Sequence, residues 1–390
     1  MNIKLTMLAV GALLWLGAGP AASAPDEAML ARLKAFAAEQ GSPIEWESVD
    51  EYEGAGGKMV TTLTNVRVGA GNEAAAISSL ELSEVSEVDG GWRIGKLSVP
   101  YQRFREGEAD IALQEFAVSG LTLPAEGQPV ETVAYEGVSL REMTVAVNNV
   151  PVFSLNDLHV EITQDDAGTM EFAGAAEAFT ISAGAVDDDT ARSIMQAMGY
   201  EQLQGYLEIE GSWNPNDGAL ELAQYDITVN DVGTLGMNVA LSGYTRDVMA
   251  GMSKAQADMA ANPDGDNTAS YMAMLGLMQR VNLHSARIQF VDDSVTNRTL
   301  DMMAEQQRAD RKTVMDQAQA ILLSQLMLFN NPQLIEQASE AVSTFLADPQ
   351  NLAVAAEPAE PLPLAVAIMT GMAAPQALPQ QLGLKFIANE

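Results

Sequence analysis

The sequence predicts an α+β protein, with a large, curved antiparallel β-meander and helices packed at its C-terminal end. Between residues 42 and 245, apolar residues alternate with polar or small ones, and Gly, Asn, Asp or Pro separate the runs. This pattern is typical of antiparallel strands with one buried face, joined by turns. From 246 to 390 the apolar spacing becomes mainly helical, with a few strand-like runs, which predicts a mixed C-terminal region packed on the sheet.

Residues 1–24 have the order of a secretory signal peptide. Lys4 precedes an apolar run from Leu5 to Leu16, and small residues follow up to Ala24. Cleavage is expected after Ala24 or, because Pro25 comes next, after Ser23. A retained anchor is the less favoured alternative, because residues 5–24 just reach the length of a bilayer span and contain several glycines. We therefore expect a periplasmic protein with no integral membrane span after signal cleavage.

Residues 25–41 are expected to form a short amphipathic helix, because Met29, Leu33 and Phe36 recur at helical spacing and Gly41 follows. A helix at 191–203 is expected to interrupt the meander that comes next. The strand-like segments of the meander are 59–68, 79–88, 92–101, 110–123, 138–147, 153–162, 205–213, 218–229 and 234–243.

Alternation in the segment 110–123 is expected to place one set of side chains on one side of its strand, although the middle of the strand is apolar enough to be buried on both sides. The set is Ile111, Leu113, Glu115, Ala117, Ser119 and Leu121.

In the C-terminal region, the helical segments 245–261 and 268–280 are rich in methionine. These methionines either fill a core or form a surface that adapts to apolar ligands, and core filling is favoured. A strand is expected at 282–291, and Asn331 with Pro332 has the residue types of a helix start. A Pro-containing connection at 359–369 and a loop with Pro375 and Pro379 are expected to precede a closing strand at 382–389.

The charge balance excludes some classes of partner. The chain has 53 Asp plus Glu against 20 Lys plus Arg, a net charge of −33. Such a chain repels phosphate groups, so no nucleic acid partner is expected. The absence of cysteine excludes disulfides, so stability must come from packing.

The two histidines give little basis for catalysis. Without cysteine and with only His159 and His284, thiolate zinc sites are excluded and a Ser-His-Asp triad has no motif to support it. His159 is expected to be a solvated or paired strand residue, and His284 a semi-buried residue with a satisfied hydrogen bond. The sequence therefore predicts no catalytic, cofactor-binding or metal-binding residue.

Two glycine- and acid-containing stretches resemble ligand-binding motifs and are better explained as turns. Gly69, Gly71 and Ala74 match the glycine spacing of a dinucleotide fingerprint, but strand-like alternation resumes where the fingerprint needs a helix. We therefore expect a hairpin loop there. The segment 262–267 offers Asp264, Asp266 and Asn267 as oxygen ligands but lacks the spacing and the distal Glu of a calcium-binding EF-hand loop, so a turn between helices is expected.

The segment FVDDSVTNRTLD, residues 290–301, has the strongest resemblance to a metal site. Asp292, Asp293, Asn297 and Asp301 are all potential oxygen ligands. The same residues are also typical of a helix start, at which a side-chain oxygen accepts a free backbone N–H. The second interpretation is favoured, with Asp293 or Ser294 as the N-cap.

The order of strand, acidic turn, helix, FLADPQNL, Pro-rich segment and closing strand resembles that of uncharacterised exported proteins of alphaproteobacteria. More distantly, the repeated strands and QFVDDSVTNRTLDMMAEQ resemble the AsmA-like envelope proteins. That resemblance implies a long curved sheet with an apolar groove for lipid. This chain is shorter and is expected to have a cleavable signal in place of an anchor, which argues against bulk lipid transport between membranes.

These observations together predict a non-enzymatic envelope protein that binds a lipid or other apolar ligand, or another envelope protein, or acts as a scaffold. The alternative is a carboxylate-based periplasmic hydrolase, with calcium or magnesium at Asp292 and Asp293.

Overall fold

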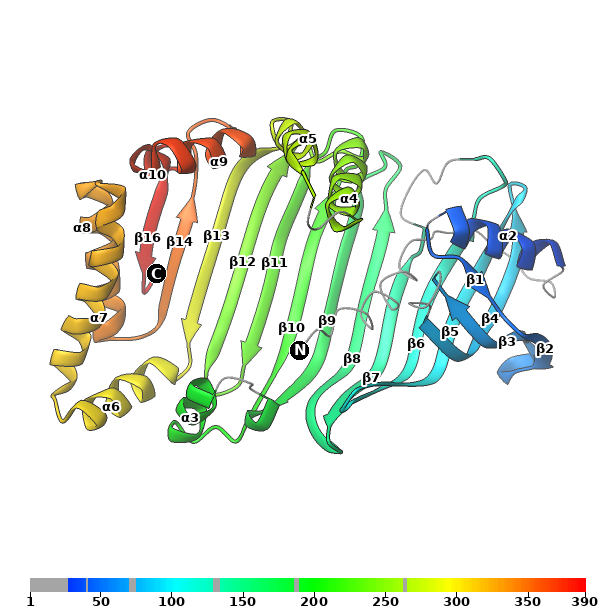
Figure 1. Ribbon diagram of the computed structural model, residues 1–390, viewed down its shortest axis with the longest axis horizontal. Coiled ribbons are helices and arrows are strands. Elements are labelled where there is room, and N and C mark those ends of the chain that lie inside the picture. Colours follow the sequence, from blue (N-terminus) through cyan, green and yellow to red (C-terminus); the bar gives the residue numbers. More distant parts are fainter. Residues whose placement is uncertain (1–26, 40, 70–74, 129–133, 186–188, 262–264) are drawn as a thin grey trace. The chain divides into compact units, whose positions relative to one another are not determined.

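The computed structural model describes residues 27–39, 41–69, 75–128, 134–185, 189–261 and 265–390 (Figure 1). The predicted signal peptide at 1–24 lies outside these residues. The predicted α+β class and large antiparallel sheet are confirmed. In the described part of the chain, 16 strands form one open sheet in the order β1-β3-β4-β5-β6-β7-β8-β9-β10-β11-β12-β13-β14-β16, with β2 paired to β3 and β15 to β13.

The strands are β1 (Ile44–Glu45), β2 (Ser48–Glu53), β3 (Met59–Val68), β4 (Ala75–Val88), β5 (Gly91–Glu106), β6 (Ala109–Leu123), β7 (Gly137–Val147), β8 (Val150–Gln164), β9 (Met170–Ser182), β10 (Gln202–Trp213), β11 (Leu220–Val229), β12 (Gly233–Ser242), β13 (Asn282–Asp292), β14 (Asn351–Ala356), β15 (Leu362–Pro363) and β16 (Leu384–Ala388). The α-helices are α2 (Glu27–Glu39), α3 (Asp189–Ala197), α4 (Arg246–Ala261), α5 (Thr268–Met278), α6 (Val295–Gln307), α7 (Arg311–Leu326), α8 (Pro332–Ala347), α9 (Leu364–Ala373) and α10 (Leu378–Leu382), and short 3-10 turns include η4 (Met327–Phe329) and η5 (Pro375–Ala377).

Several boundaries differ from the sequence predictions. Strand β9 was not predicted, because alanine and glycine fill many of its positions and weaken the alternation. Helix α3 ends at Ala197, before the predicted 203, and Gly199 follows with a φ of 84°. The predicted connection at 359–369 contains most of helix α9, and the predicted loop around Pro375 and Pro379 is helical in η5 and α10. Proline suits the first turn of a helix, so the prolines there mark helix starts.

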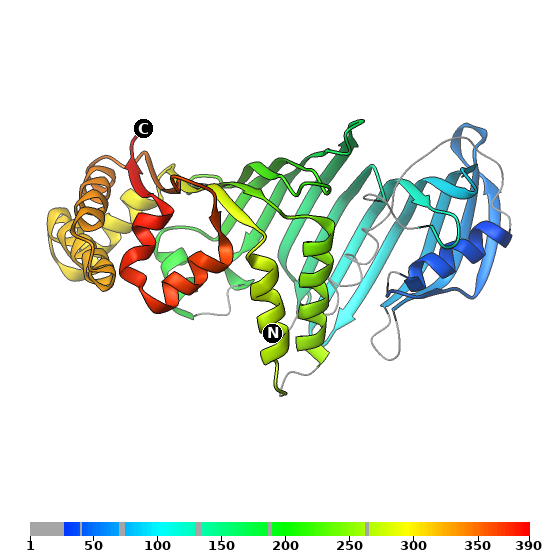
Figure 2. The ribbon, with the colours of Figure 1, turned by 90° about the horizontal axis from the view of Figure 1, so that it is seen from above.

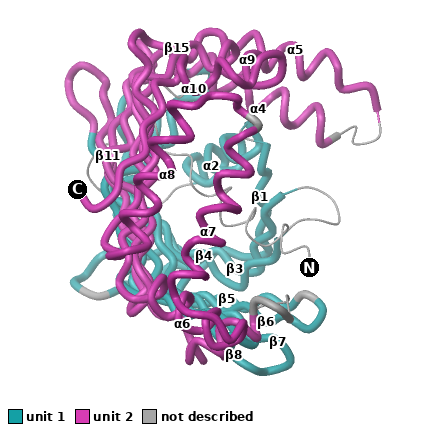
Figure 3. The backbone as a smooth tube through the Cα atoms, turned by 90° about the vertical axis from the view of Figure 1, so that its left-hand side faces the viewer, with its two compact units in different colours: residues 1–163, 173–185 teal, residues 164–172, 186–390 magenta. Residues whose placement is uncertain are grey.

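The chain divides into two compact units (Figure 3). Unit 1 comprises residues 1–163 and 173–185, and unit 2 comprises 164–172 and 186–390. The division falls within the range 42–245 that alternation assigns to the meander. Each unit is described by itself below.

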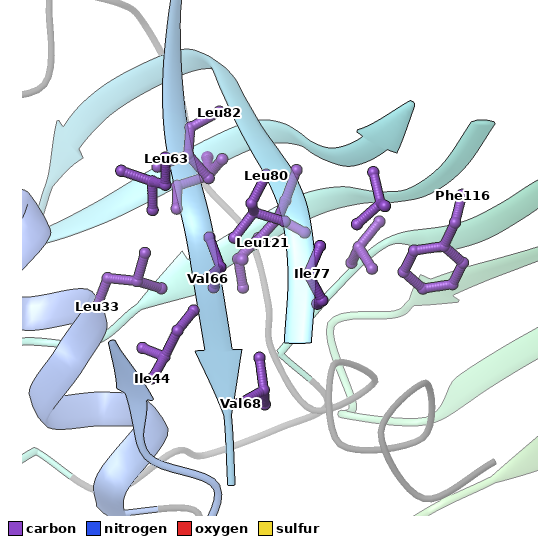
Figure 4. Packing of buried hydrophobic residues seen from close by; sticks show 14 of the residues in the cluster. Leu33, Ile44, Leu63, Val66, Val68, Ile77, Leu80, Leu82, Phe116 and Leu121 are labelled. Carbon is purple, nitrogen blue, oxygen red and sulfur yellow. The ribbon is translucent and has the colours of Figure 1, made fainter. Parts of the chain in front are cut away.

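Unit 1 has a core between helix α2 and the sheet (Figure 4). Met29, Leu33 and Phe36 are buried in α2, and the helix contacts both β1 and β6, which lie several strands apart in the sheet order. The sheet of unit 1 therefore curves around α2. Arg32 is also buried, and its Nε donates to the carbonyl of Pro124, just after β6, at 2.5 Å.

Backbone kinks inside the strands of unit 1 produce this curvature. Strand β6 buries Ile111 and Leu113, then Phe116 and Val118 beyond a kink at Glu115, where φ is 51°. A second kink at Gly120, with a φ of 67°, moves burial to Leu121 and Leu123. The prediction that the odd-numbered residues 111–121 share one side is therefore wrong. The prediction of a middle buried on both sides is confirmed, since residues 116–118 are all buried.

The kinks lie opposite one another on neighbouring strands. Glu84 in β4, with a φ of 56°, lies between residues whose partners flank Gly95 in β5. Gly95 in turn lies opposite Gly120 in β6. A Cβ atom on Gly95 would lie 2.6 Å from the Cβ of Glu84, so glycine is required beside the kink. Aligned irregularities of this kind bend a sheet across several strands.

Candidate functional site

The sheet of unit 2 places apolar side chains in rows on one face. In an antiparallel pair, residues directly opposite each other have side chains on the same face. Two rows cross β12, β13 and β14: Met237, Ile288 and Val354 in one, and Leu235, Phe290 and Leu352 in the other. We call these side chains the apolar face.

The apolar face is uncovered in the part of the chain that the structure describes. Ile288 is 55% exposed, Leu235 48% and Val354 37%, and the other members are half-buried. Strand residues this apolar are normally covered by another layer, so their exposure indicates a surface for another molecule.

The rows continue on both sides of the apolar face. Towards β10, Leu235 lies opposite Ile227, which lies opposite Leu207, and both are partly exposed. Towards the last strand, Val354 lies opposite Phe386 of β16, and Phe386 packs against the α7–α8 cluster that contains Leu334. Helix α8 thus covers the end of the row at β16 and leaves Ile288 open.

The opposite face of these strands and of neighbouring β11 carries polar side chains next to Val291, Ala353 and Ala355. On β13, Arg287 Nε donates to Gln289 Oε1 at 3.1 Å. On β11, Gln224 Nε2 donates to Asp226 Oδ2 at 2.9 Å. The polar side chains on this face are suited to water, whereas the apolar face is suited to hydrocarbon.

The four candidate ligands in FVDDSVTNRTLD lie just before helix α6 or within its first half, and each has a protein partner. Asp292 Oδ1 accepts the Thr296 N–H at 2.8 Å, and Asp293 Oδ2 accepts the Asp231 N–H at 3.0 Å. Both Asn297 and Asp301 accept from Arg311, the latter at 3.0 Å. These bonds explain the carboxylates as parts of a junction between β13, α6 and α7.

The cap of α6 differs in detail from the prediction. Ser294 occupies the N-cap position, as expected, but makes no capping bond with its side chain. The oxygen of Asp292 accepts the first-turn N–H instead, because Asp293 is held by the turn before β12 and Ser294 Oγ donates to the carbonyl of Asp231.

The two histidines lie far apart in the sheet order. His159 in β8 is exposed, and its Nδ1 lies 3.5 Å from the carbonyl oxygen of Asp157. His284 in β13 has Nε2 2.8 Å from Ser242 Oγ, as a satisfied histidine should, but it is exposed and not semi-buried. It is the third residue of β13, where solvent reaches the ring. Neither of these hydrogen bonds joins a histidine to a carboxylate, as a Ser-His-Asp triad requires.

The remaining candidate ligands lie in turns. Gly69, with a φ of 102°, ends β3 and donates its N–H to Pro43 O at 2.8 Å, whereas Gly71 and Ala74 lie outside the described residues. Asp264 also lies outside them, and Asp266 Oδ1 accepts the Thr268 N–H at 3.0 Å. Hydrogen bonding to Thr268, by its side chain first and then by its backbone N–H, keeps the pKa of Asp266 below its ordinary value. Within the described ranges, no group of three or more His, Asp or Glu side chains is placed to hold a metal ion.

The Met-rich helices are less buried than expected. Met272 in α5 is 62% exposed, and the methionines at 249, 252, 259, 274 and 278 are half-buried. The expectation of core filling is therefore wrong for Met272. No helix among the described residues is long and apolar enough to cross a membrane.

Residues 226–389 match a protein family described as "Uncharacterized protein". The matched segment includes all of β12, β13 and β14 and therefore the whole apolar face. A search of curated proteins gives no match.

Proposed function

We propose that the chain is a non-enzymatic envelope protein that binds a lipid, or another ligand with an acyl chain, on the apolar face of unit 2. The single observation that supports this proposal best is the exposure of Ile288, Leu235 and Val354 in adjoining rows of a regular sheet. Aliphatic, aromatic and thioether side chains without a charged group bind hydrocarbon and offer no acid, base or nucleophile.

The magnitude of burial supports a hydrocarbon ligand. Fully burying a large apolar side chain contributes roughly 1.5–3 kcal/mol, so covering a half-exposed one contributes about 1 kcal/mol. An acyl chain lying across several of these side chains would therefore gain several kcal/mol. The polar face offers less gain, because hydrocarbon lying on it would also cover polar groups such as Arg287 and Gln289, which costs free energy.

The proposal includes export to the periplasm, for which the order of residues 1–24 is the support. Fractionation of cells that express the full chain checks it. Export predicts protein in the periplasmic fraction that begins at Ala24 or Pro25. Protein that keeps Met1 and sediments with membranes would instead support the retained anchor.

Binding of a fluorescent fatty acid to the delipidated full chain tests the proposed ligand class. Ile288→Ser removes an exposed member of the apolar face and is expected to weaken binding about fivefold, the equivalent of about 1 kcal/mol. Val291→Ser is the matched control, because Val291 is 42% exposed on the opposite face of the same strand. It is expected to bind like the unchanged chain.

Equal weakening by both substitutions, or no uptake by the unchanged chain, would contradict lipid binding. A scaffold role predicts the second of these results. The hydrolase alternative gains no support from the region proposed for it, since Asp292 and Asp293 are both engaged by backbone N–H groups.

A further inference from the structure

Helices α5 and α9 of unit 2 are uncharged and touch each other. Residues 267–279 and 361–384 contain no Asp, Glu, Lys or Arg, in a chain of which 19% is charged. The two helices are in contact, and both lie at the same end of the strands (Figure 1). Helix α5 also packs beside α4 (Figure 2), where Gly251 adjoins Leu277.

The outer side chains of these helices are large, apolar and exposed. In α5 no residue is buried, and in α9 only Ala365 is. Their exposed side chains form what we call the helical patch: Tyr271 (60%), Met272 (62%), Val366 (39%), Ile368 (40%), Met369 (56%) and Met372 (83%). Exposed apolar patches rimmed by polar residues mark interaction sites, so these side chains point to an occupant.

The chemistry of the helical patch favours the surface of a bilayer of neutral phospholipids. Methionine is flexible and adapts to a fluid partner, and tyrosine is enriched at membrane interfaces. A second copy of the chain would bring its own charge of −33 against the first. Anionic headgroups would be repelled for the same reason, whereas neutral headgroups would not. A folded protein partner would gain no ion pair from residues 267–279 or 361–384.

The position of α9 connects the helical patch with the apolar face. Helix α9 follows β15, which pairs with β13 through Leu283↔Leu362, and β13 also bears Ile288. With 10 residues, α9 is about 15 Å long, too short to cross a bilayer but suited to lie in its surface.

We propose that the helical patch docks the protein on a neutral phospholipid bilayer. The proposal rests on the proposed function in one respect: docking there would put the apolar face next to a source of lipid.

Flotation of the full chain with phosphatidylcholine vesicles tests docking. The unchanged chain is expected to float with the vesicles. The triple variant Met272→Ser, Met369→Ser, Met372→Ser is expected to lose vesicle binding at least tenfold, because each substitution removes exposed apolar area that the bilayer would cover. The matched control is Ile321→Ser with Val291→Ser, since these side chains are 65% and 42% exposed on α7 and β13, outside the helical patch. It is expected to float like the unchanged chain.

Three results would overturn docking: an unchanged chain that stays in solution, a triple variant that floats normally, or an unchanged chain that is dimeric without vesicles and becomes monomeric in the triple variant. The last result would assign the patch to a second copy. Fatty acid binding in solution separates this proposal from the proposed function. The triple variant should keep it, and Ile288→Ser should weaken it but still float.

Discussion

The side chain of Gln102 takes the place of backbone hydrogen bonds where β4 and β5 of unit 1 separate. Backbone pairing between β4 and β5 extends only to Glu81↔Ser98. Beyond this point the buried side chain of Gln102 bridges the strands, with Nε2 donating to Ala76 O at 3.1 Å and Oε1 accepting the Ser78 N–H at 2.8 Å. A buried amide of this kind is costly to remove, because its partners are left without bonds.

Gln102→Leu is therefore expected to lower the free energy of unfolding by about 1–3 kcal/mol, measured by urea unfolding. Gln114→Leu is the matched control, because Gln114 bonds to the side chains of Glu142 and Arg141, which water can replace. A loss at Gln102 no larger than at Gln114 would show that the bridge is not important for stability.

Asp110 gives unit 1 a pH dependence in acid. Its carboxylate accepts hydrogen bonds from Arg103 and Arg105, which lower its pKa from 3.8 to about 2. A carboxyl group whose pKa is lowered by folding stabilises the protein at pH values above its ordinary pKa. This contribution is lost as the pH falls from about 4 to about 2. Asp110→Asn is expected to flatten the fall of the urea midpoint across this range. An unchanged slope in the variant would mean that the pair with the arginines does not stabilise the fold.

At the residue scale, the sequence predicted where helices start better than which residues form the hydrogen bonds there. The start of α6 was predicted from residue types, and so was the start of α8, where Asn331 Oδ1 accepts the Leu334 N–H. The choice of Asp292 as the capping oxygen of α6 was not predictable, because it depends on Asp231, a residue distant in sequence that holds Asp293.

At the element scale, periodicity located most strands but not the kinks inside them. Strand propensity and alternation describe a regular strand, whereas Glu84 and Glu115 adopt positive φ with a residue type that rarely does so. Gly120, and to some extent Asn65 and Asp157, have residue types that favour such a conformation. The curvature of unit 1 therefore depends on tertiary contacts that override local preference.

Gly95→Ala tests the kinks, and Gly276→Ala is the control, with an expected change of opposite sign in the free energy of unfolding. Gly95→Ala places a Cβ 2.6 Å from that of Glu84 and is expected to lower the free energy of unfolding by about 1–3 kcal/mol. Gly276→Ala, in helix α5, meets no atom within 4 Å and is expected to raise it by about 0.5–1 kcal/mol. Urea unfolding of both variants provides the measurement, and a neutral Gly95→Ala would contradict the account of the kinks.

At the scale of the whole molecule, the sequence predicted the class of the fold and the presence of a half-buried sheet. It did not predict which apolar residues stay uncovered. Ile288 was within the strand predicted at 282–291, but its exposure and that of Val354 depend on how far helix α8 covers the sheet, and helix placement is a tertiary property. Register was the missing information, since only strand pairing brings Met237, Ile288 and Val354 into one row.

Photo-crosslinking with a diazirine-bearing fatty acid locates the ligand on the delipidated full chain and so tests whether the apolar face is the binding surface. Mass spectrometry of the digested protein identifies the modified residues. Lipid binding on the apolar face predicts adducts at Leu235, Ile288 or Val354, and excess unlabelled fatty acid should suppress them. Adducts confined to Val291 and the polar face, or adducts that excess fatty acid does not suppress, would contradict it.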